Sequence, residues 1–472
     1  MNTELPRLII AGLSGDSGKT IVSLSLLAAL RRNGLSAIAF KKGPDYIDAA
    51  WLGRLAGAPC RNLDTYMVAP EIVRERFMRH GAGADIALIE GNRGLFDGRD
   101  AAGTHSTAEL AKLLQAPVLL VVNAAKTTRT VAALIKGCQA FAPDIVFAGV
   151  VLNRTAGKRH TQVITEAVER YCGLPVLGVL PKLSGNPGLI PSRHLGLVTP
   201  AESGKDAEME DRLADIGAEH LDIERILAAA RKTAALPAAA DLPAPRQLRA
   251  RIGYFSDPVF TFYYPENLEA LAAQGAELVP ISSIVDGNLP DIDGLYIGGG
   301  FPETHAQRLA DNTAMMASVR SAAKAGLPIY AECGGLIYLA KSITWKGHRY
   351  PMCGLFPLDL RMQSKPAGHG YTLLKVDRPN PFFAQDVEIK GHEFHYSALK
   401  EEPEIEATCM RVEIGAGLGG RREGLVKNNV LACYTHIHSD AVSSWAPGFL
   451  ARADEYRLRL AKPLLKLAGR QP

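Results

Sequence analysis

The chain has 472 residues, 47% hydrophobic and 22% charged, a composition typical of a globular protein with roughly two to four domains. Its 53 Lys and Arg residues nearly balance 49 Asp and Glu residues, and the net charge of +4 excludes a strongly basic surface for nucleic acid or acidic membranes. The seven cysteines form no CxxC pair and no Cys/His cluster at zinc-finger spacing, which excludes a disulfide framework and a zinc finger.

The beginning of the chain does not have the pattern of a signal peptide, because residues 1–7 run directly into the strand-like residues 8–11. The longest apolar run, near residues 116–122, is far shorter than the ~20 residues of a membrane-spanning helix. We therefore expect a reduced, cytoplasmic protein with small-molecule partners, and neither a membrane nor a nucleic acid. The sequence leaves the oligomeric state open, with a homodimer as one option.

In the first half of the chain, continuous apolar runs alternate with helical segments. Continuous rather than alternating apolar strands indicate a parallel sheet that helices cover on both faces. The expected strands are 8–12, 37–41, 86–90, 118–122, 147–152 and 176–180, and the expected helices include 20–32, 106–114, 130–141 and 161–171.

The first strand runs into GLSGDSGKT at residues 12–20, and an apolar helix follows at once. Small residues in such a turn let backbone N–H groups and a helix N-terminus approach the phosphates of a nucleotide. The spacing, Gly-x5-Gly-Lys-Thr, is one residue longer than the strict Walker A pattern. Lys19 adds a charge for the outer phosphates, and the Thr20 hydroxyl can bind Mg²⁺. We predict an ATP site at Gly15, Asp16, Ser17, Gly18, Lys19 and Thr20.

Two carboxylates follow predicted strands, at the sheet edge where parallel sheets bind ligands. Asp45 and Glu90 are therefore candidates, together with Thr20, for binding the Mg²⁺ of the nucleotide. A turn aspartate and a solvated glutamate are the alternative interpretation. Lys41 is a candidate for neutralising the outer phosphate of ATP, and a surface lysine is the alternative.

After about residue 221 the composition changes, and residues 228–246 are rich in Ala and Pro. A second α/β series then begins, with expected strands at 252–255, 277–280, 294–297, 328–330 and 430–434. We predict a P-loop ATP-binding domain at 1–235, a linker at 236–249, a second α/β domain at 250–445 and a C-terminal tail at 446–472.

A candidate nucleophile lies in AECGG at residues 331–335, between a strand and a helix. A cysteine in such a tight turn is exposed, and a helix N-terminus lowers the pKa of its thiol. We therefore predict that Cys333 is the nucleophile. Gly334 beside it leaves room for substrate and frees a backbone N–H for an oxyanion.

Two further elements complete a candidate glutaminase. Three glycines follow the strand at 294–297, and Gly299 and Gly300 are candidates for an oxyanion or glutamine-holding loop. A late strand ends in CYTHIH at residues 433–438, where His436 is the candidate base and His438 a second catalytic candidate. The histidine pair in GHEFHYS at 391–397 resembles a metal pair, but without a third ligand we expect a structural role.

The second half resembles the class I, or triad-type, glutamine amidotransferases, in the variant found in cobyrinic acid amide synthases. Triad enzymes end the late strand in His-x-Glu, whereas this chain has His436-Ile437-His438, a departure that the variant shares. The first half resembles the dethiobiotin-synthetase-like P-loop domain. Over nearly its whole length the chain is similar to the cobyrinic acid a,c-diamide synthase family, as the motifs KGPDYID (42–48), RNLD (61–64), IEGNRGLFDG (89–98), RHLGL (193–197), FYYPENL (262–268) and GHEFHYS (391–397) indicate.

This resemblance implies an α/β fold in two parts: a parallel-sheet P-loop ATPase domain and a flavodoxin-like class I glutamine amidotransferase domain. It implies a C–N ligase in which Cys333 and His436 release ammonia from glutamine. ATP with Mg²⁺ would phosphorylate the a and c carboxylates of a corrin-type macrocycle, and ammonia would then displace phosphate. The family pattern suggests that the macrocycle contacts Tyr46, Asp48, Tyr263 and Tyr264.

Cobyrinic acid, in cobalamin biosynthesis, is the first choice of substrate. Relatives of the same architecture amidate hydrogenobyrinic acid, nickel sirohydrochlorin or sirohaem, and no motif separates these. A partitioning ATPase or a non-catalytic tetrapyrrole carrier would leave Cys333, His436 or Lys19 without a role.

Overall fold

The computed structural model describes residues 2–182, 192–193, 196–203, 207–240, 246–401 and 404–468. The chain divides into two compact units, residues 1–241 and 242–472. The division falls within the segment 236–249 that we predicted as a linker, of which residues 241–245 lie outside the described part. At its start, β11 (Leu236–Pro237) is not free linker, because it pairs with β1 (Asn2–Thr3).

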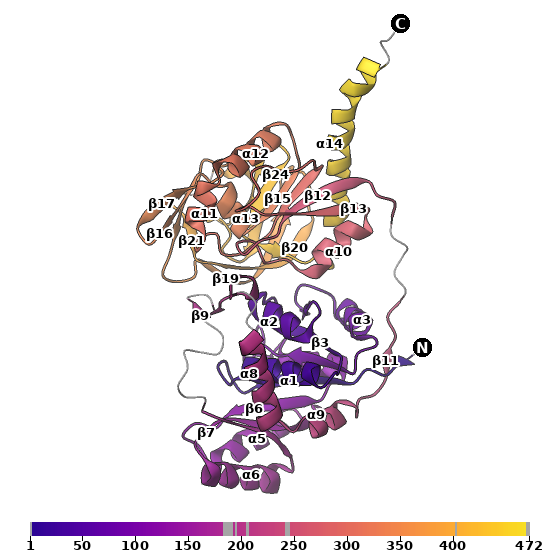
Figure 1. Cartoon of the computed structure of the whole chain (residues 1–472), viewed down its shortest axis with the longest axis vertical. Coiled ribbons are helices and arrows are strands. Elements are labelled where there is room, and N and C mark those ends of the chain that lie inside the picture. The colour runs from indigo at the N-terminus through magenta and orange to yellow at the C-terminus, as the bar shows by residue number, and fades with distance from the viewer. Residues whose placement is uncertain are drawn as a thin grey trace. The chain divides into compact units, whose positions relative to one another are not determined.

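The first unit is built on a parallel sheet (Figure 1, indigo to magenta). Every neighbouring pair of its strands is parallel, as the continuous apolar runs predicted. The strand order is β4 (Arg61–Leu63), β3 (Ala37–Lys42), β5 (Ile86–Glu90), β2 (Arg7–Gly12), β6 (Val118–Asn123), β7 (Phe147–Thr155) and β8 (Val176–Pro181). Beyond this sheet, β9 (Ser192–Arg193) and β10 (Gly196–Leu197) pair with each other.

Helices of the first unit cover the sheet. One apolar core joins the sheet to α1, α2, α8 and α9. The helices are α1 (Lys19–Arg32), α2 (Ile47–Ala56), α3 (Pro70–Gly81), α4 (Thr107–Leu114), α5 (Thr130–Phe141), α6 (Lys158–Cys172), α7 (Pro200–Ser203), α8 (Ala207–His220) and α9 (Ile223–Ala230).

The second unit contains a mixed sheet. Its first five strands are parallel and follow the order 2-1-3-4-5 of flavodoxin-like folds, as the resemblance implied. Five further strands extend it in antiparallel pairing. The full order is β13 (Ala276–Ile281), β12 (Ala250–Phe255), β14 (Gly294–Ile297), β15 (Ile329–Glu332), β24 (Val430–Cys433), β23 (Arg422–Lys427), β22 (Thr408–Ile414), β19 (Gly368–Val376), β20 (Glu388–His395) and β25 (His436–Ile437).

A smaller sheet and several helices complete this unit. The small sheet has the order β17 (His348–Pro351), β16 (Ser342–Trp345), β18 (Asp359–Met362) and β21 (Ser397–Leu399). The helices are α10 (Pro265–Ala273), α11 (Ala306–Asp311), α12 (Thr313–Lys324), α13 (Gly334–Leu339), a 3-10 turn (Ile405–Ala407) and α14 (Trp445–Ala468).

The prediction of a C-terminal tail at 446–472 is wrong for most of that segment. Residues up to Ala468 belong to α14, the yellow helix of Figure 1. Trp445, Phe449 and Leu450 are completely buried in the core of the second unit. Their spacing places them on one side of a helix, and burying such large side chains stabilises the helix against the sheet.

Candidate active sites

The predicted phosphate-binding turn lies between β2 and α1. A side chain on Gly12 would collide with Ser17, and one on Gly18 would collide with the amide of Asn153. Gly18 also has a φ of +96°, a conformation that favours glycine. A Cβ at Gly15 would meet nothing within 4 Å, so this part of the turn is open to a ligand. The turn thus has the close packing and the open face of a phosphate-binding loop.

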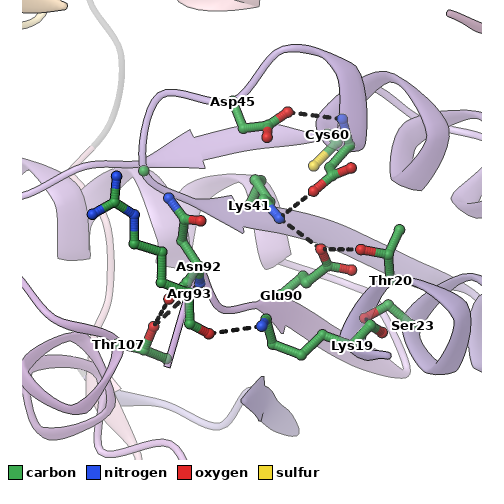
Figure 2. Close-up of polar contacts among 12 residues, drawn as sticks. Lys19, Thr20, Ser23, Lys41, Asp45, Cys60, Glu90, Asn92, Arg93 and Thr107 are labelled. Atoms are coloured by element: carbon green, nitrogen blue, oxygen red, sulfur yellow. Dashed lines mark hydrogen bonds and ion pairs between the residues drawn. The ribbon is translucent and has the colours of Figure 1, made fainter. Parts of the chain in front are cut away.

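Lys19 lies at the start of α1 and is buried. Its ammonium group donates to the carbonyl oxygens of Ser14, at 3.1 Å, and Arg93, at 2.7 Å. Figure 2 shows the lysine reaching toward Arg93. Burial, and then the nearby charge of Lys41, lower the pKa of Lys19. A negatively charged phosphate at this position would restore the preference for the charged form.

Lys41 lies between two carboxylates at the end of β3 (Figure 2). Its Nζ is 2.6 Å from Oε1 of Glu90 and 2.7 Å from Oδ2 of Asp48, and its side chain is only 2% exposed. Burial opposes its charge, but Asp48 and Glu90 outweigh burial and raise the pKa of Lys41 well above its usual value. The alternative of a surface lysine is therefore wrong. In the structure the ammonium group forms ion pairs with the carboxylates of Asp48 and Glu90.

The candidate Mg²⁺ ligands come from three elements. Thr20 donates its hydroxyl to Oε1 of Glu90 at 3.1 Å, and Oε2 of Glu90 is buried without a hydrogen-bond partner. Oδ1 of Asp45 accepts the N–H of Asp48 at 2.8 Å, and burial, followed by the charge of Asp48, raises the pKa of Asp45 to about 7. Across the described ranges, no group of three or more His, Cys, Asp and Glu side chains could hold a metal ion. The unpartnered Oε2 of Glu90 beside the Thr20 hydroxyl fits Mg²⁺ only together with phosphate oxygens, which would supply its other ligands.

Cys333 lies in the turn between β15 and α13. Its φ of 47° and ψ of −94° are strained for a residue with a side chain, as in the nucleophile elbows of hydrolases. Its N–H donates to the carbonyl oxygen of Cys433 at 2.7 Å, which fixes the turn to β24. The predicted strand–turn–helix position of this cysteine is present in the structure.

The expectation that the Cys333 thiol is exposed and has a lowered pKa is wrong. The side chain is 5% exposed, and burial, followed by the charges of Glu303 and Glu332, raises its pKa. The N–H of Gly334 acts in the opposite direction but is outweighed. A single short helix cannot compensate for burial beside two carboxylates, so the resting thiol keeps its proton.

The glycine loop after β14 packs against this turn. A Cβ on Gly334 would lie 2.9 Å from the nitrogen of Gly300, and a Cβ on Gly299 would collide with Cε1 of His436. The N–H of Gly299 donates to Phe262 at 3.3 Å. The loop thus lies beside both the cysteine turn and the histidine, and glycine is needed at each of these contacts.

His436 is buried in β25 and contacts a carboxyl group. Its Nδ1 lies 3.5 Å from Oε2 of Glu332, and its ring stacks on the ring of His392, with centroids 4.9 Å apart. The hydroxyl of Tyr296 and the N–H of Ile437 also donate to Glu332, each at 3.1 Å. Glu332 is the residue directly before Cys333, so one carboxyl group links the candidate nucleophile and the candidate base.

His438, predicted as a second catalytic residue, faces other groups. Its Nε2 lies 3.7 Å from Oε2 of Glu266, its Nδ1 accepts the N–H of Asp440 at 3.2 Å, and its ring packs on Tyr264. His438 lies just beyond the end of β25, so strand alternation does not place it on the same face as His436. The group that faces Nδ1 of His436 is Glu332, and we assign no catalytic step to His438.

The two tyrosines predicted to contact the macrocycle in the second half are directed into their own unit. The hydroxyl of Tyr263 donates to Phe255 and accepts the N–H of Gly298, at 2.7 and 2.8 Å. Tyr264 is completely buried, with its hydroxyl 3.3 Å from Nδ1 of His392. Both hydroxyls have partners within the second unit, so the structure gives no support to a substrate contact. Tyr46 and Asp48 lie at the start of α2, beside the carboxylate cluster.

The sequence analysis gave Glu332 and Tyr296 no role, although both support the site. A glutamate at the end of an apolar strand, directly before a candidate nucleophile, is a usable signal, because a buried carboxyl group needs a partner. The same analysis expected a structural histidine pair in 391–397. His392 stacks on His436, and His395 stacks on Tyr434 with ring centroids 3.6 Å apart.

Comparison with known proteins identifies both halves. A model of the CobQ/CobB/MinD/ParA nucleotide binding domain matches residues 8–188, and a model of the CobB/CobQ-like glutamine amidotransferase domain matches residues 251–443. These matches confirm the predicted order of the two α/β domains. Among solved structures, a glutamine amidotransferase has a TM-score of 0.31 and 20% identity, and the match covers 43% of this chain and 98% of that chain.

Three curated relatives, each named cobyrinate a,c-diamide synthase, match along nearly the whole chain. The protein of Magnetococcus marinus is 41% identical over 98% of this chain and 100% of its own length. Those of Archaeoglobus fulgidus and Syntrophotalea carbinolica are 39% and 43% identical, over 95% and 92% of this chain and 98% and 95% of their own. The chain therefore belongs to the cobyrinate a,c-diamide synthase family.

Proposed function

We propose that the chain is a C–N ligase that uses ATP and glutamine to convert the a and c carboxylates of cobyrinate into amides. The observation that supports this proposal is that one chain holds two separate groups of candidate site residues. One is a phosphate-binding turn beside Lys41 and Glu90, and the other is a strained Cys333 whose neighbour Glu332 faces His436. The names of the relatives supply the substrate.

In the glutaminase unit, the Sγ of Cys333 attacks the side-chain amide carbon of glutamine, and His436 takes the thiol proton. Because burial keeps the thiol protonated, this transfer accompanies the attack. The proton then goes to the leaving nitrogen, which departs as ammonia and leaves a glutamyl thioester. Water hydrolyses the thioester to glutamate. The backbone N–H groups of Gly300 and Gly334 would hold the oxyanion, a role supported by the close approach of these two glycines.

In the nucleotide unit, a carboxylate oxygen of the macrocycle attacks the γ-phosphorus of ATP, and ADP leaves. Ammonia then attacks the acyl phosphate and releases phosphate. Lys19 leaves its two carbonyl partners to bind the outer phosphates, while the turn from Gly15 to Thr20 supplies N–H groups. Bound Mg²⁺ would neutralise phosphate charge, held by Thr20, Glu90 and Asp45. Lys41 keeps Glu90 and Asp48 in place.

The start of α2 is the position that we propose for the reacting carboxylate. Tyr46 and Asp48 follow Asp45 directly and lie in the same charged cluster as Lys41 and Glu90. A substrate contact by Tyr46 and Asp48 therefore stays a prediction, argued from their place beside the candidate Mg²⁺ ligands. A cytoplasmic location also stays a prediction; no helix in the described ranges has both the length and the apolar character to cross a membrane.

The test is a mass-shift assay of the purified chain with ATP, Mg²⁺ and glutamine. Cobyrinate is compared with sirohaem, nickel sirohydrochlorin and hydrogenobyrinic acid. We expect cobyrinate to be amidated twice, and each amidation should lower its mass by about one unit. A Cys333→Ser variant should amidate with ammonium salts but not with glutamine. Turnover of another tetrapyrrole but not of cobyrinate would contradict the proposed substrate. Failure to amidate any of them with ammonium salts would contradict the proposed synthase activity of the nucleotide unit.

A further inference from the structure

Glu332 is a buried carboxyl group that the mechanism above does not use. It ends β15, is 0% exposed and is directly followed by Cys333. Burying a carboxyl group is costly unless donors surround it. Two donors do so, the Tyr296 hydroxyl and the N–H of Ile437, and Nδ1 of His436 lies 3.5 Å away. Ile437 and His436 both belong to β25, which carries the base.

The contacts of Glu332 fix both the backbone and the ring of the base. Oε1 accepts the N–H of Ile437, which holds β25 in place, and Oε2 lies 3.5 Å from the ring nitrogen of His436. The 3.5 Å separation is longer than a good hydrogen bond, and such contacts commonly shorten when substrate binds. The same carboxyl group therefore determines where β25 lies and which edge of the imidazole faces it.

An acceptor beside Nδ1 decides the tautomer of His436. It favours the proton on Nδ1, which leaves the lone pair of Nε2 for the thiol proton. Cε1 and Nε2 lie on the side of the ring that faces Gly299 in the glutamine-holding loop. On its face the ring meets His392, whose pKa is lowered well below its usual value by burial, then by His436. The neighbouring ring is thus neutral, and Glu332 is the charge that compensates an imidazolium.

We propose that Glu332 is the positioning residue of the glutaminase, orienting His436 and stabilising its protonated form. In triad amidotransferases this role belongs to the glutamate two residues after the histidine, a position that His438 occupies here. Glu332 approaches the base instead from the strand that carries the nucleophile. This inference rests on the proposed glutaminase reaction and concerns only that half of the function.

The alternative is that Glu332 only ties three strands together. The two roles differ in their electrical consequences, because a carboxylate favours the charged form of a neighbouring base and raises the pKa of Cys333. The titratable groups that interact with Glu332 or His436 from the elements packed around them are Tyr263, Tyr296, Tyr330, Cys333, His392 and Cys433, and His369 acts on His392. None of these is a carboxylate that could replace the effect of Glu332 on both neighbours.

The experiment uses Glu332→Gln in the full chain, which keeps the shape and an acceptor for Ile437 but removes the charge. We expect kcat for glutamine hydrolysis to fall on the order of 100-fold or more, with little change in KM for glutamine. Amidation with ammonium salts should be unchanged. The acidic limb of kcat/KM should move to lower pH, and alkylation of Cys333 should also begin at lower pH.

Three further variants separate charge from structure. Glu332→Asp keeps the charge and should recover part of the lost rate. Glu266→Gln makes the same change in another buried carboxyl group beside a histidine, His438, and should leave both pH profiles unchanged. Tyr296→Phe removes one donor from Oε2, so the acidic limb should move to higher pH; this variant serves if Glu332→Gln does not fold.

The proposal would be overturned if Glu332→Gln hydrolysed glutamine at the wild-type rate. It would also be overturned if the rate fell while the pH profiles of kcat/KM and of Cys333 alkylation stayed where they are in the wild type. A folded Tyr296→Phe protein with an unshifted acidic limb would overturn it as well. By contrast, a wild-type protein that releases no ammonia from glutamine would overturn the proposed function itself, which makes the two failures distinguishable.

Discussion

The ammonium nitrogen of Lys41 lies 2.6 Å from Oε1 of Glu90, and both side chains are almost completely buried. The same nitrogen is 2.7 Å from Asp48, so one cation holds two carboxylates that come from different elements. Glu90 in turn accepts the hydroxyl of Thr20 in the phosphate-binding turn. The ion pair therefore connects the position proposed for substrate to the position proposed for ATP and Mg²⁺.

Replacing Lys41 by Met should destabilise the first unit and stop its chemistry. Removing one partner of a buried ion pair leaves an uncompensated charge and typically costs about 3–5 kcal/mol. We expect a lower melting temperature and no ammonia-dependent amidation, while glutamine hydrolysis persists. Lys136→Met, at an exposed position of α5, is the control. Unchanged stability and synthesis in Lys41→Met would contradict a structural role of this pair.

All parallel strands of both units except β4 could be predicted, most of them because apolar residues fill them; β4 has the sequence RNL and was not predicted. β5 and β14, for example, have the predicted bounds. The antiparallel strands β19, β20, β22 and β23 were not predicted. β19 alternates buried and more exposed residues, and only pairing with distant strands determines its register.

The candidate site could be predicted to the level of motifs but not of partners. Lys19 and Cys333 each lie beside glycines in a short segment of their own, so the spacing within each segment indicates its chemistry. The partner of His436 could not be found this way, since Glu332 and Ile437 meet across 105 positions of sequence. Likewise, the lowered pKa expected for Cys333 followed from its local turn, whereas burial by the whole unit determines the observed direction.

Gly299→Ala should reduce glutaminase activity without unfolding the protein. The added methyl group would collide with Cε1 of His436 and displace the base, and an error of about 1 Å in such a group costs on the order of 100-fold in rate. Ammonia-dependent amidation should remain. Gly287→Ala is a matched control in the same unit, because a Cβ there meets nothing within 4 Å. Equal glutaminase rates in the two variants would contradict the proposed loop contact.

The cysteines should be unreactive in the folded protein at neutral pH. All seven are buried, and burial is the first cause of the raised pKa of Cys138, Cys172, Cys333, Cys353, Cys409 and Cys433. Since only the thiolate reacts, alkylation by iodoacetamide should be slow at pH 7.5 and should still accelerate above pH 9.

Mass spectrometry of the intact protein measures this reaction, with urea-unfolded protein as the control that labels at all seven sites. Rapid labelling of Cys333 at pH 7.5 without glutamine would show that its thiolate is already formed. It would then contradict the transfer of the thiol proton to His436 during attack.

Glu423 should make the second unit less stable as the pH rises. The residue is buried in β23 and accepts the N–H groups of Gly424 and Tyr434. Burial raises the pKa of Glu423 from 4.5 to about 8. The N–H of Gly424 acts against burial, and the charge of Glu393 adds to it. Between these values the folded state holds a proton that the unfolded state has lost. The free energy of unfolding therefore falls as the pH rises from about 4.5 to about 8, by a few kcal/mol at most.

Glu423→Gln tests this because it keeps an acceptor for both N–H groups and removes the ionisation. At pH 5 the variant and the wild type should melt at similar temperatures, since the wild-type carboxyl group is then neutral in the fold. At pH 9 the variant should melt at a higher temperature, and the difference should grow mainly between pH 5 and 8. A difference that is constant with pH would mean that Glu423 titrates normally in the fold and that the charge of Glu393 and burial have little effect on it.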